Sequence, residues 1–294
     1  MFEEFKNAFQ RHNNGHVQLI LINVVVFVVM TILRLVLTST VGHDAFALIH
    51  DQFSIPPLIG DFVQRPWTMI TYAFAHDLTG ILHIFFNMLA LYWFGRLFVE
   101  YLGSDKVIAV YVLGALAGAV AYLGVYNLVP YYAERFPVGM VGASAAVYAV
   151  VVAVATLLPD YTFFLLFLGP VRIKYIAAVY IVISLVGAIG ANEGGNVAHL
   201  GGALIGFVYI KQLQAGNNWG RWITSILDWF RRLSSARRHV KVTYRKSGES
   251  RKGSPRPPSI SQDEIDTILD KISDGGYESL TKEEKEKLFN ASKK

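Results

Sequence analysis

Six stretches of this sequence are apolar over roughly the length of helix that crosses a lipid bilayer, about 20 residues at about 1.5 Å each. Of the 294 residues, 53% are hydrophobic and 17% charged, against about 45–50% and about 25% in soluble domains, so the excess apolar surface must face lipid. The sequence therefore predicts an all-α membrane protein with six transmembrane helices. These lie near residues 17–38, 79–101, 106–127, 142–158, 172–190 and 197–214.

The chain contains no cysteine, which excludes disulfides, thiolate nucleophiles and cysteine-ligated metals. Its first residues, MFEEFKNAFQRHNNGH, carry two acidic side chains and lack a short apolar core before a cleavage site. They therefore do not resemble a secretory signal or a transit peptide. We expect the first apolar segment to remain in the mature protein, preceded by a cytoplasmic segment of residues 1–16.

The fourth apolar segment is short and rich in alanine, whereas its neighbours carry Leu, Phe and Tyr. A helix that is crowded on all sides needs small side chains so that its neighbours can approach its backbone closely. We therefore expect the segment at 142–158 to be the central helix of the bundle. Its alanines are Ala143, Ala145, Ala146, Ala149, Ala153 and Ala155.

Basic residues are distributed unevenly between the loops, which predicts the orientation of the chain in the membrane. The expected outer loops hold only Arg65 and Arg135. This bias predicts that both termini are cytoplasmic. The expected inner segments hold Lys6, Arg11, Arg96, Lys106, Arg172, Lys174 and the basic run from Lys211 to Arg256.

The connection at 39–78 is long, and its run RPWTMITYAFAHD is too short to cross a bilayer and too apolar for a free loop. We expect it to lie in the outer leaflet, with Trp67 and Tyr72 at the level of the headgroups. Long structured loops are often functional. We also expect His76, at the end of this loop, near the entrance for substrate.

Three further segments follow a predicted membrane core at 17–215. Residues 216–233 alternate apolar and basic side chains at helical spacing, which predicts an amphipathic helix on the inner leaflet. Residues 234–260 are basic and rich in Ser and Pro, as in a disordered cytoplasmic linker. Residues 261–294 carry the capping boxes Ser261–Glu264 and Thr281–Glu284, which predict a cytoplasmic helical hairpin. Its small core makes docking onto an unknown cytoplasmic partner at least as plausible as independent folding.

Polar residues within the apolar segments are the most informative, because a polar group in hydrocarbon is costly and usually functional. His83 and Asn87 lie one turn apart on the second segment, and Ser144 and Tyr148 lie one turn apart at the start of the fourth. The sixth segment carries His199 on the same face as two glycines that allow close helix packing, Gly202 and Gly206.

A serine beside a histidine can act as a nucleophile and its base. The alcohol becomes a useful nucleophile when an imidazole within about 3 Å accepts its proton. A helix N-terminus adds free backbone N–H donors and favours developing negative charge. Because the membrane segments offer no acidic third member at this depth, a dyad is favoured over a triad. Taken singly, each of these residues is also compatible with ordinary helix packing or a structural hydrogen bond.

The arrangement resembles the rhomboid family of intramembrane serine proteases, over about residues 17 to 214. The motifs are His83-x-x-x-Asn87, Gly142-x-Ser144, Ala198-His199, Gly202-x-x-x-Gly206 and the large first loop. The resemblance implies that Ser144 is the nucleophile and His199 the general base. It implies an oxyanion hole of His83, Asn87 and the Ser144 backbone N–H, with Tyr148 stacked beneath the histidine ring.

The resemblance also implies a bacterial six-transmembrane form in the cell inner membrane, with the active site open to the outer face. Its substrates would be single-spanning transmembrane proteins, cut through an acyl-enzyme. No metal, cofactor or nucleic-acid partner is expected, and the lipid bilayer is the surrounding medium. Two positions depart from the family pattern. Ala145 stands where glycine is usual and could narrow the site, and Thr68 follows Trp67 where arginine is common.

Two other functions remain open on the sequence. One is a catalytically inactive relative that binds membrane proteins, although such relatives typically lack the serine or the histidine. The other is a six-helix transporter with a polar path, although the repeats typical of transporters are not found. For the protease, we expect a water-filled cavity roofed by 39–78, with His83 and Asn196 at its rim. The fifth segment would be its lateral gate.

Overall fold

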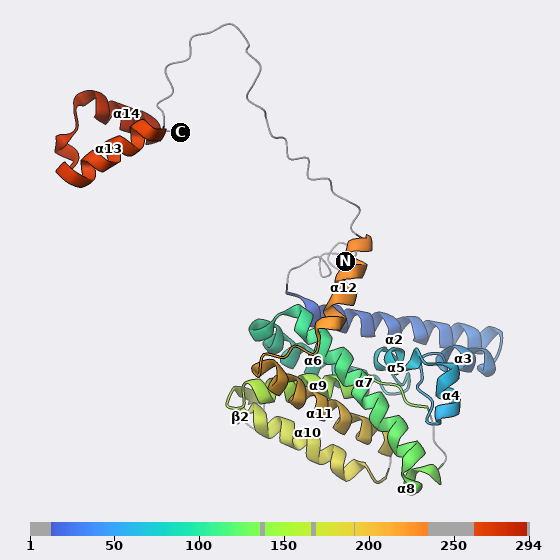
Figure 1. Cartoon of the computed structure of the whole chain (residues 1–294). Coiled ribbons are helices and arrows are strands. Elements are labelled where there is room, and N and C mark those ends of the chain that lie inside the picture. The colour runs from blue at the N-terminus through green and yellow to red at the C-terminus, as the bar shows by residue number, and fades with distance from the viewer. Residues whose placement is uncertain (1–12, 136–138, 166–168, 191, 235–261, 293–294) are drawn as a thin grey trace. The chain divides into compact units, whose positions relative to one another are not determined.

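The computed structural model of the chain describes residues 13–135, 139–165, 169–190, 192–234 and 262–292. The chain divides into two compact units, one within residues 1–237 and one within residues 238–294. The first unit is a bundle of helices with one small β-hairpin, and the second is a pair of helices (Figure 1).

Each of the six apolar segments forms a helix, within a few residues of its predicted bounds. Within the part of the chain that the structure describes, only α2, α6 and α7 combine the length and the apolar character that a membrane span requires, while α9 and α10 are apolar but shorter. The membrane character is thus supported, and the count of six spans stays a prediction. The six helices are α2 (Gly15–Thr40), α6 (Ile81–Leu102), α7 (Ser104–Leu128), α9 (Ser144–Leu157), α10 (Ile173–Gly187) and α11 (Glu193–Gln214).

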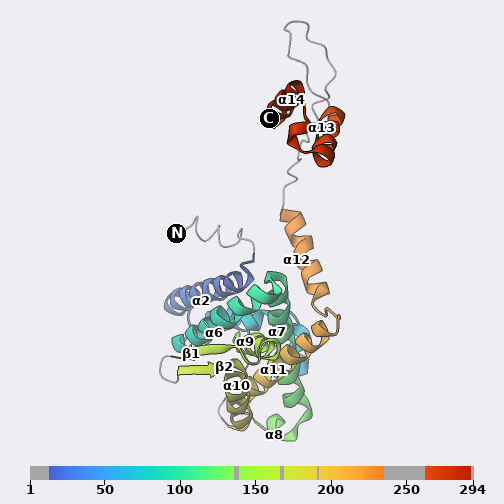
Figure 2. The same ribbon diagram turned by 90° about the vertical axis from the view of Figure 1, so that its left-hand side faces the viewer.

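Helix α9 lies at the centre of the bundle, in contact with α6, α7, α10 and α11 (Figure 2). Two pairs of glycines make this possible. A Cβ added at Gly118 would lie 2.6 Å from the Cβ of Ala145, and one added at Gly114 would lie 2.5 Å from the Cβ of Ala149. On the other side of α9, a Cβ at Gly202 or Gly206 would overlap the backbone carbonyl of the same two alanines. Small residues therefore bring α7 and α11 against the backbone of α9.

A β-hairpin joins α9 to α10, which the all-α prediction did not include. Strand β1 (Thr162–Leu165) pairs antiparallel with β2 (Gly169–Arg172), and Thr162 lies opposite Arg172. Pro159 lies two residues beyond the end of α9, where a proline commonly follows a helix because it cannot continue one. The Asp160 carboxylate then accepts a hydrogen bond from Lys174 Nζ at 2.7 Å, which holds the base of the hairpin to the start of α10.

The connection between α2 and α6 is structured and packs onto the bundle. Its Tyr72 is fully buried and donates its hydroxyl hydrogen to the Ala115 carbonyl on α7, 2.7 Å away. The expectation that Tyr72 anchors the connection among the headgroups is therefore wrong, because its side chain is buried in protein, whereas Trp67 is half-exposed. Attachment of this connection to the membrane stays a prediction. Its elements are α3 (His43–His50), α4 (Ile59–Gln64), α5 (Thr68–Thr71) and the 3-10 turn η1 (Tyr72–Phe74).

Two short elements complete the first unit. Helix α8 (Pro130–Ala133) follows α7, and α12 (Arg221–Ser234) occupies most of the segment expected to lie on the inner leaflet. Helix α12 exposes Trp222, Ile226 and Trp229. This pattern suits a membrane surface, and contact with lipid stays a prediction.

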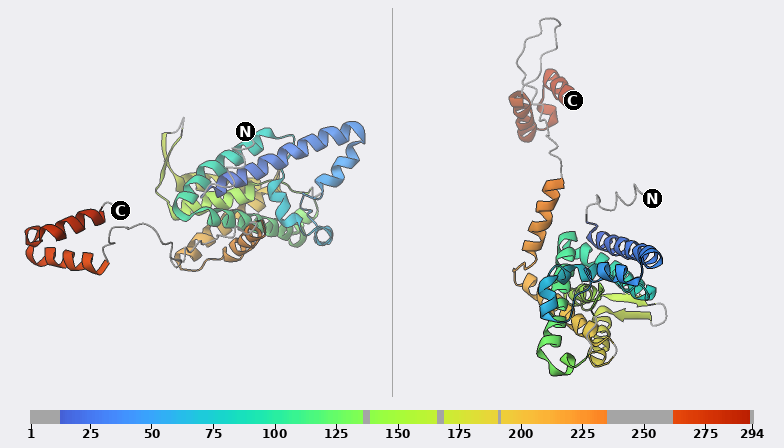
Figure 3. Two further views of the ribbon diagram at one scale, coloured as in Figure 1. Left: turned by 90° about the horizontal axis from the view of Figure 1, so that it is seen from above. Right: turned by 90° about the vertical axis from the view of Figure 1, so that its right-hand side faces the viewer.

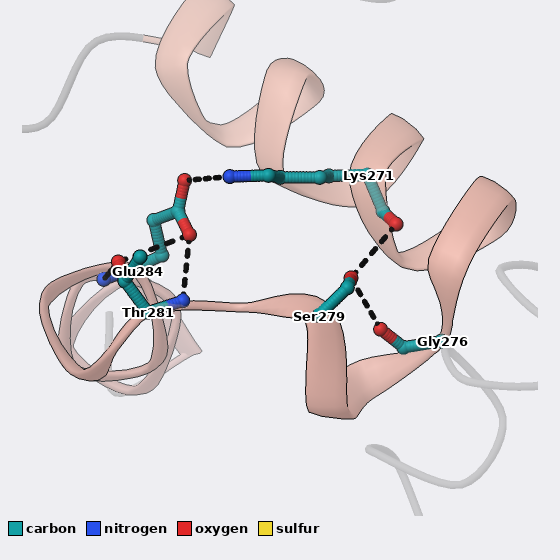
Figure 4. A network of polar contacts seen from close by, with 5 residues as sticks. All are labelled: Lys271, Gly276, Ser279, Thr281 and Glu284. Carbon is teal, nitrogen blue, oxygen red and sulfur yellow. Dashed lines mark hydrogen bonds and ion pairs between the residues drawn. The ribbon is translucent and has the colours of Figure 1, made fainter.

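The second unit is a helical hairpin of α13 (Gln262–Gly275), the turn η2 (Tyr277–Ser279) and α14 (Lys282–Ser292), with the two helices side by side (Figure 3). At the start of α14, Glu284 accepts a hydrogen bond from the Thr281 backbone N–H at 2.8 Å and another from Lys271 Nζ at 2.9 Å (Figure 4). The Thr281–Glu284 capping box is therefore formed. Ser261, of the other box, lies outside the described residues, as do 1–12 and nearly all of the linker expected at 234–260.

Candidate active site

Ser144 is the first residue of α9 and follows a sharp change of chain direction. Gly142 has φ of +142°, a conformation that L-residues with a Cβ rarely adopt. Its N–H donates to the Tyr72 carbonyl at 3.0 Å, which fixes this turn against the first connection. The turn leaves Ser144 half-buried in the first turn of α9, where backbone N–H groups have no partner within the helix.

His199 reaches Ser144 from α11. Its Nε2 lies 2.7 Å from the Ser144 Oγ, and its side chain is only 8% exposed. This meeting follows from the helix packing, because Gly202 lies one turn after His199 and seats α11 on the backbone of α9 at Ala145. The two helices thus bring an alcohol and an imidazole, 55 residues apart in the chain, within hydrogen-bond distance.

Tyr148 lies one turn below Ser144 and supports the imidazole. Its ring stacks on that of His199 with centroids 4.3 Å apart and an interplanar angle of 16°. On its other side it contacts Tyr180 of α10, with centroids 5.0 Å apart. The stacking fixes the plane of the imidazole, and with it the direction of Nε2.

Ser184 also belongs to this cluster, and the sequence analysis missed it. It is fully buried on α10, with its Oγ 3.2 Å from His199 Nδ1 and 3.0 Å from the Tyr148 hydroxyl. The signal that could have found it is a serine in the apolar run YIVISLVG, since a polar side chain in a membrane segment is functional by default.

A cavity of about 560 Å³ adjoins the Ser144–His199 pair. His83 and Asn87 of α6 both line it, as does Tyr148. Asn87 Nδ2 donates to the His83 carbonyl at 2.9 Å, so this contact uses one hydrogen of its side-chain amide. A Cβ at Gly142 would lie 3.5 Å from His83 Nε2, which places this ring beside the turn that precedes Ser144.

Ala145 does not narrow the site in the way its extra methyl suggested. The side chain is 1% exposed, and its Cβ faces α7 at Gly118. It is not one of the residues lining the cavity at Ser144. The methyl group that replaces the usual hydrogen is therefore accommodated by a glycine on the neighbouring helix.

Two further residues were expected at the mouth of the site. His76 is buried, at 2% exposed, and its ring lies edge-on to that of His83 with the centroids 6.1 Å apart, so its place near an entrance stays a prediction. Burial, with His83 nearby, lowers the pKa of His76 to about 4. Asn196 does not line the cavity, and instead donates to the Gly187 carbonyl at 3.0 Å, tying the end of α10 to α11.

These features define a serine–histidine site inside a helical membrane bundle. Residues 63–214, more than half of the chain, match the family model of the Rhomboid domain. The chain belongs to the rhomboid family, and the resemblance stated from the sequence is confirmed. Residues 259–294 match a family of unknown function (DUF6576).

Two curated proteins of Arabidopsis thaliana are similar to the chain. RHOMBOID-like protein 12, mitochondrial, is 32% identical over 170 residues, which are 52% of this chain and 48% of that protein. Rhomboid-like protein 16, chloroplastic, is 28% identical over 167 residues, which are 52% of this chain and 50% of that protein. The chain thus spans about half the length of the curated relatives it matches.

Proposed function

We propose that this protein is an intramembrane serine endopeptidase. The observation that carries the proposal is the 2.7 Å contact between Ser144 Oγ and His199 Nε2 beside the 560 Å³ cavity. A nucleophile and base at this separation are the minimum for acyl transfer, and the stacked ring of Tyr148 holds the base in line.

The proposed reaction has two halves. In the first, Ser144 Oγ attacks the peptide carbonyl carbon while its proton passes to His199 Nε2, and the protonated imidazole then delivers that proton to the leaving amine. In the second, Nε2 takes a proton from water as the hydroxide attacks the acyl-enzyme, and returns it to Ser144 Oγ as the acid leaves. Donors directed at the developing oxyanion are His83, the free amide hydrogen of Asn87 and the Ser144 backbone N–H.

The proposed substrates are single-spanning membrane proteins that enter between α6 and α10. Both helices line the cavity, through Phe86 and Ile183 among others, and these two side chains are 60% and 59% exposed. In a bilayer such surfaces face lipid, so a transmembrane segment could approach the site sideways. Of the residues in α10, only Ile173, Ala177 and Ser184 are buried, which suits a helix that moves.

Cross-linking tests this route, because the chain has no cysteine of its own. A pair of substitutions, Phe86→Cys and Ile183→Cys, joined by a bifunctional thiol reagent should block cleavage of a transmembrane substrate. The single variants treated with the same reagent are the controls. Unchanged turnover in the cross-linked protein contradicts lateral entry.

The main experiment uses the full chain, purified in detergent, with a model transmembrane substrate. Ser144→Ala and His199→Ala should each lower turnover by at least about a thousandfold. Ser39→Ala is the matched control, because Ser39 donates to the Leu35 carbonyl on α2, far along the chain from the site. Cleavage that persists in either site variant removes this mechanism.

The second candidate is an inactive relative that binds membrane proteins, and the observation that favours it is Ala145 in place of the usual glycine. Burial of that methyl against α7 weakens the objection to catalysis. No cleavage across many substrates, together with no labelling of Ser144 by a fluorophosphonate, would favour the binding function.

We also propose that both termini face the cytoplasm and that the hairpin at 262–292 docks onto a cytoplasmic partner. The uneven distribution of Lys and Arg supports the orientation. Location in a bacterial inner membrane stays a prediction. Alkylation of single cysteines introduced at Ser39 and at Ser279, in intact cells with a membrane-impermeant reagent, should label only the first.

A further inference from the structure

We propose that Ser184 is a positioning residue that fixes the tautomer of His199. The proposal rests on the proposed protease function and adds a third member to its Ser144–His199 pair. Ser184 is fully buried, and its Oγ lies 3.2 Å from His199 Nδ1. It thus occupies the side of the imidazole opposite to Ser144, where an orienting group of a hydrolase would stand.

The hydrogen bonds of Ser184 differ from those of three other Ser and Thr hydroxyls on the helices of the bundle. Thr31, Ser39 and Thr156 each donate to the carbonyl four residues earlier in their own helix. Ser and Thr side chains within helices commonly donate their hydroxyl hydrogen to a backbone carbonyl in this local way. Ser184 instead makes contacts with side chains of two other helices, Tyr148 on α9 and His199 on α11.

The direction of each hydrogen follows from the chemistry of the base. For His199 Nε2 to accept the Ser144 proton, the neutral imidazole must carry its hydrogen on Nδ1. That N–H donates to Ser184 Oγ at 3.2 Å, and the Ser184 hydroxyl in turn donates to the Tyr148 oxygen at 3.0 Å. Every hydrogen then has one acceptor. In the opposite tautomer Nε2 would carry the hydrogen and donate it to Ser144 Oγ, so the base could not accept the serine proton.

The contact strengthens during the reaction. When His199 accepts the Ser144 proton it becomes an imidazolium with a hydrogen on each nitrogen. The Ser184 oxygen then accepts from a charged donor, and such hydrogen bonds are about twice as strong as neutral ones. Ser184 therefore stabilises the protonated base in addition to holding the neutral one, without itself gaining or losing a proton.

The placement of Ser184 on α10 makes this support depend on the position of that helix. The other buried residues of α10 are apolar, Ile173 and Ala177. A movement of α10 away from the bundle would separate Ser184 from Nδ1 while Tyr148, on α9, stayed stacked on the ring. His199 is thus held in its reactive tautomer when α10 is packed against the bundle.

The test combines kinetics with ¹⁵N NMR of the full chain in detergent, labelled at its eight histidines and assigned by difference with His199→Gln. In the wild type, His199 should show hydrogen on Nδ1 and none on Nε2. Ser184→Ala should lower kcat by about ten- to a hundredfold with little change in KM, and should mix the two tautomers.

Two controls separate orientation from packing. Ser184→Cys keeps the volume of the side chain but offers a weak acceptor, so it should lose activity as Ser184→Ala does. Ala177→Gly removes a buried methyl from the same face of α10 and should lower the melting temperature while leaving kcat and the tautomer unchanged. Full activity in Ser184→Cys, or equal kcat losses in Ala177→Gly and Ser184→Ala, would overturn the proposal.

The two proposals fail in different ways. If the wild type cleaves no substrate and resists the fluorophosphonate, the protease function fails whatever the tautomer of His199. If the wild type is active and Ser184→Ala changes neither kcat nor the ¹⁵N signals of His199, the role of Ser184 fails and the protease function stands.

Discussion

Gly202 of α11 is seated on the carbonyl group of Ala145 in α9, so closely that a Cβ at residue 202 would overlap that oxygen. The contact lies one residue after Ser144 in one helix and three after His199 in the other. The spacing of the two reactive groups therefore depends on the absence of a side chain at Gly202, which links the packing of the bundle to its chemistry.

Gly202→Ala should accordingly push α11 away from α9. We expect a loss of stability of about 1–3 kcal/mol, which is typical of overpacking. Turnover should also fall strongly, because His199 Nε2 moves out of hydrogen-bond distance of the Ser144 hydroxyl. Thermal unfolding and a cleavage assay in detergent measure the two effects. The matched control is Gly124→Ala on α7, where an added Cβ has nothing within 4 Å. A Gly202→Ala protein as stable and active as this control would contradict the packing argument.

Ala145→Gly should keep most of the activity, although it restores the residue usual in the family. The Ala145 methyl faces Gly118 and does not line the cavity, so its removal changes packing and not the site. Gly118→Ala alone should be destabilising, because its Cβ would lie 2.6 Å from that of Ala145. Combining the two changes should recover part of the loss, and strictly additive effects on the melting temperature would show that the two methyl positions do not compete.

His83→Ala should lower kcat by about 10²–10³-fold with a small change in KM, as expected when one oxyanion donor is removed. His83 lines the cavity beside Gly142. Ile81→Ala is the control, since Ile81 is 68% exposed on the same helix and does not line the cavity. A fall in substrate affinity with kcat intact would instead assign His83 to substrate binding.

The helices of the bundle could be predicted well because they depend on local features. The predicted segments 79–101 and 106–127 match α6 and α7 within two residues at either end, since a long apolar run sets the extent of a membrane helix without reference to the rest of the fold. Most polar residues of the site were also found locally, because a polar side chain is costly in hydrocarbon and is therefore conspicuous in an apolar segment. They are His83, Asn87, Ser144, Tyr148 and His199.

What could not be predicted depends on contacts between segments that are distant in the chain. Tyr72 was expected at the membrane interface because tyrosine is common there. Its packing on Ala115 of α7 makes it a core residue instead. The strands of the hairpin are four residues each and are defined by their pairing. Ser184 carries a local signal as a serine in an apolar run, but its role follows only from its contact with His199 of α11.

Tyr111→Phe should loosen the first connection. The Tyr111 hydroxyl donates to the Ala73 carbonyl at 2.7 Å and accepts from Asn23 Nδ2 at 3.1 Å, so it joins α7, η1 and α2. Its removal leaves two buried polar groups with one partner fewer, at a cost of about 1–3 kcal/mol. Hydrogen exchange of the 43–74 backbone should rise and the melting temperature should fall.

Tyr209→Phe is the control for this prediction. Tyr209 is also fully buried, and the described residues give its hydroxyl no hydrogen-bond partner. Loss of that hydroxyl should be neutral or stabilising. Equal destabilisation by Tyr111→Phe and Tyr209→Phe would mean that the hydrogen bonds of Tyr111 contribute little to docking the connection.

Acidification should weaken the C-terminal hairpin through Glu284. The hydrogen bond from Lys271, with those from Thr281, lowers the pKa of Glu284 to about 2, against about 4.3 for an ordinary glutamate. Because the carboxylate is stabilised in the folded hairpin, its contribution to stability is complete above the ordinary pKa and is lost as the pH falls from about 4.3 towards 2.

The test is NMR of the full chain labelled with ¹³C at its glutamate side chains, in which the Glu284 signal should still be that of a carboxylate at pH 3.5. Glu284→Gln should speed hydrogen exchange at the start of α14 at neutral pH. Glu283→Gln, in the same turn but outside the Lys271–Thr281 network of Figure 4, should leave this exchange unchanged. Titration of Glu284 near its ordinary pKa would show that this network does not hold the hairpin together.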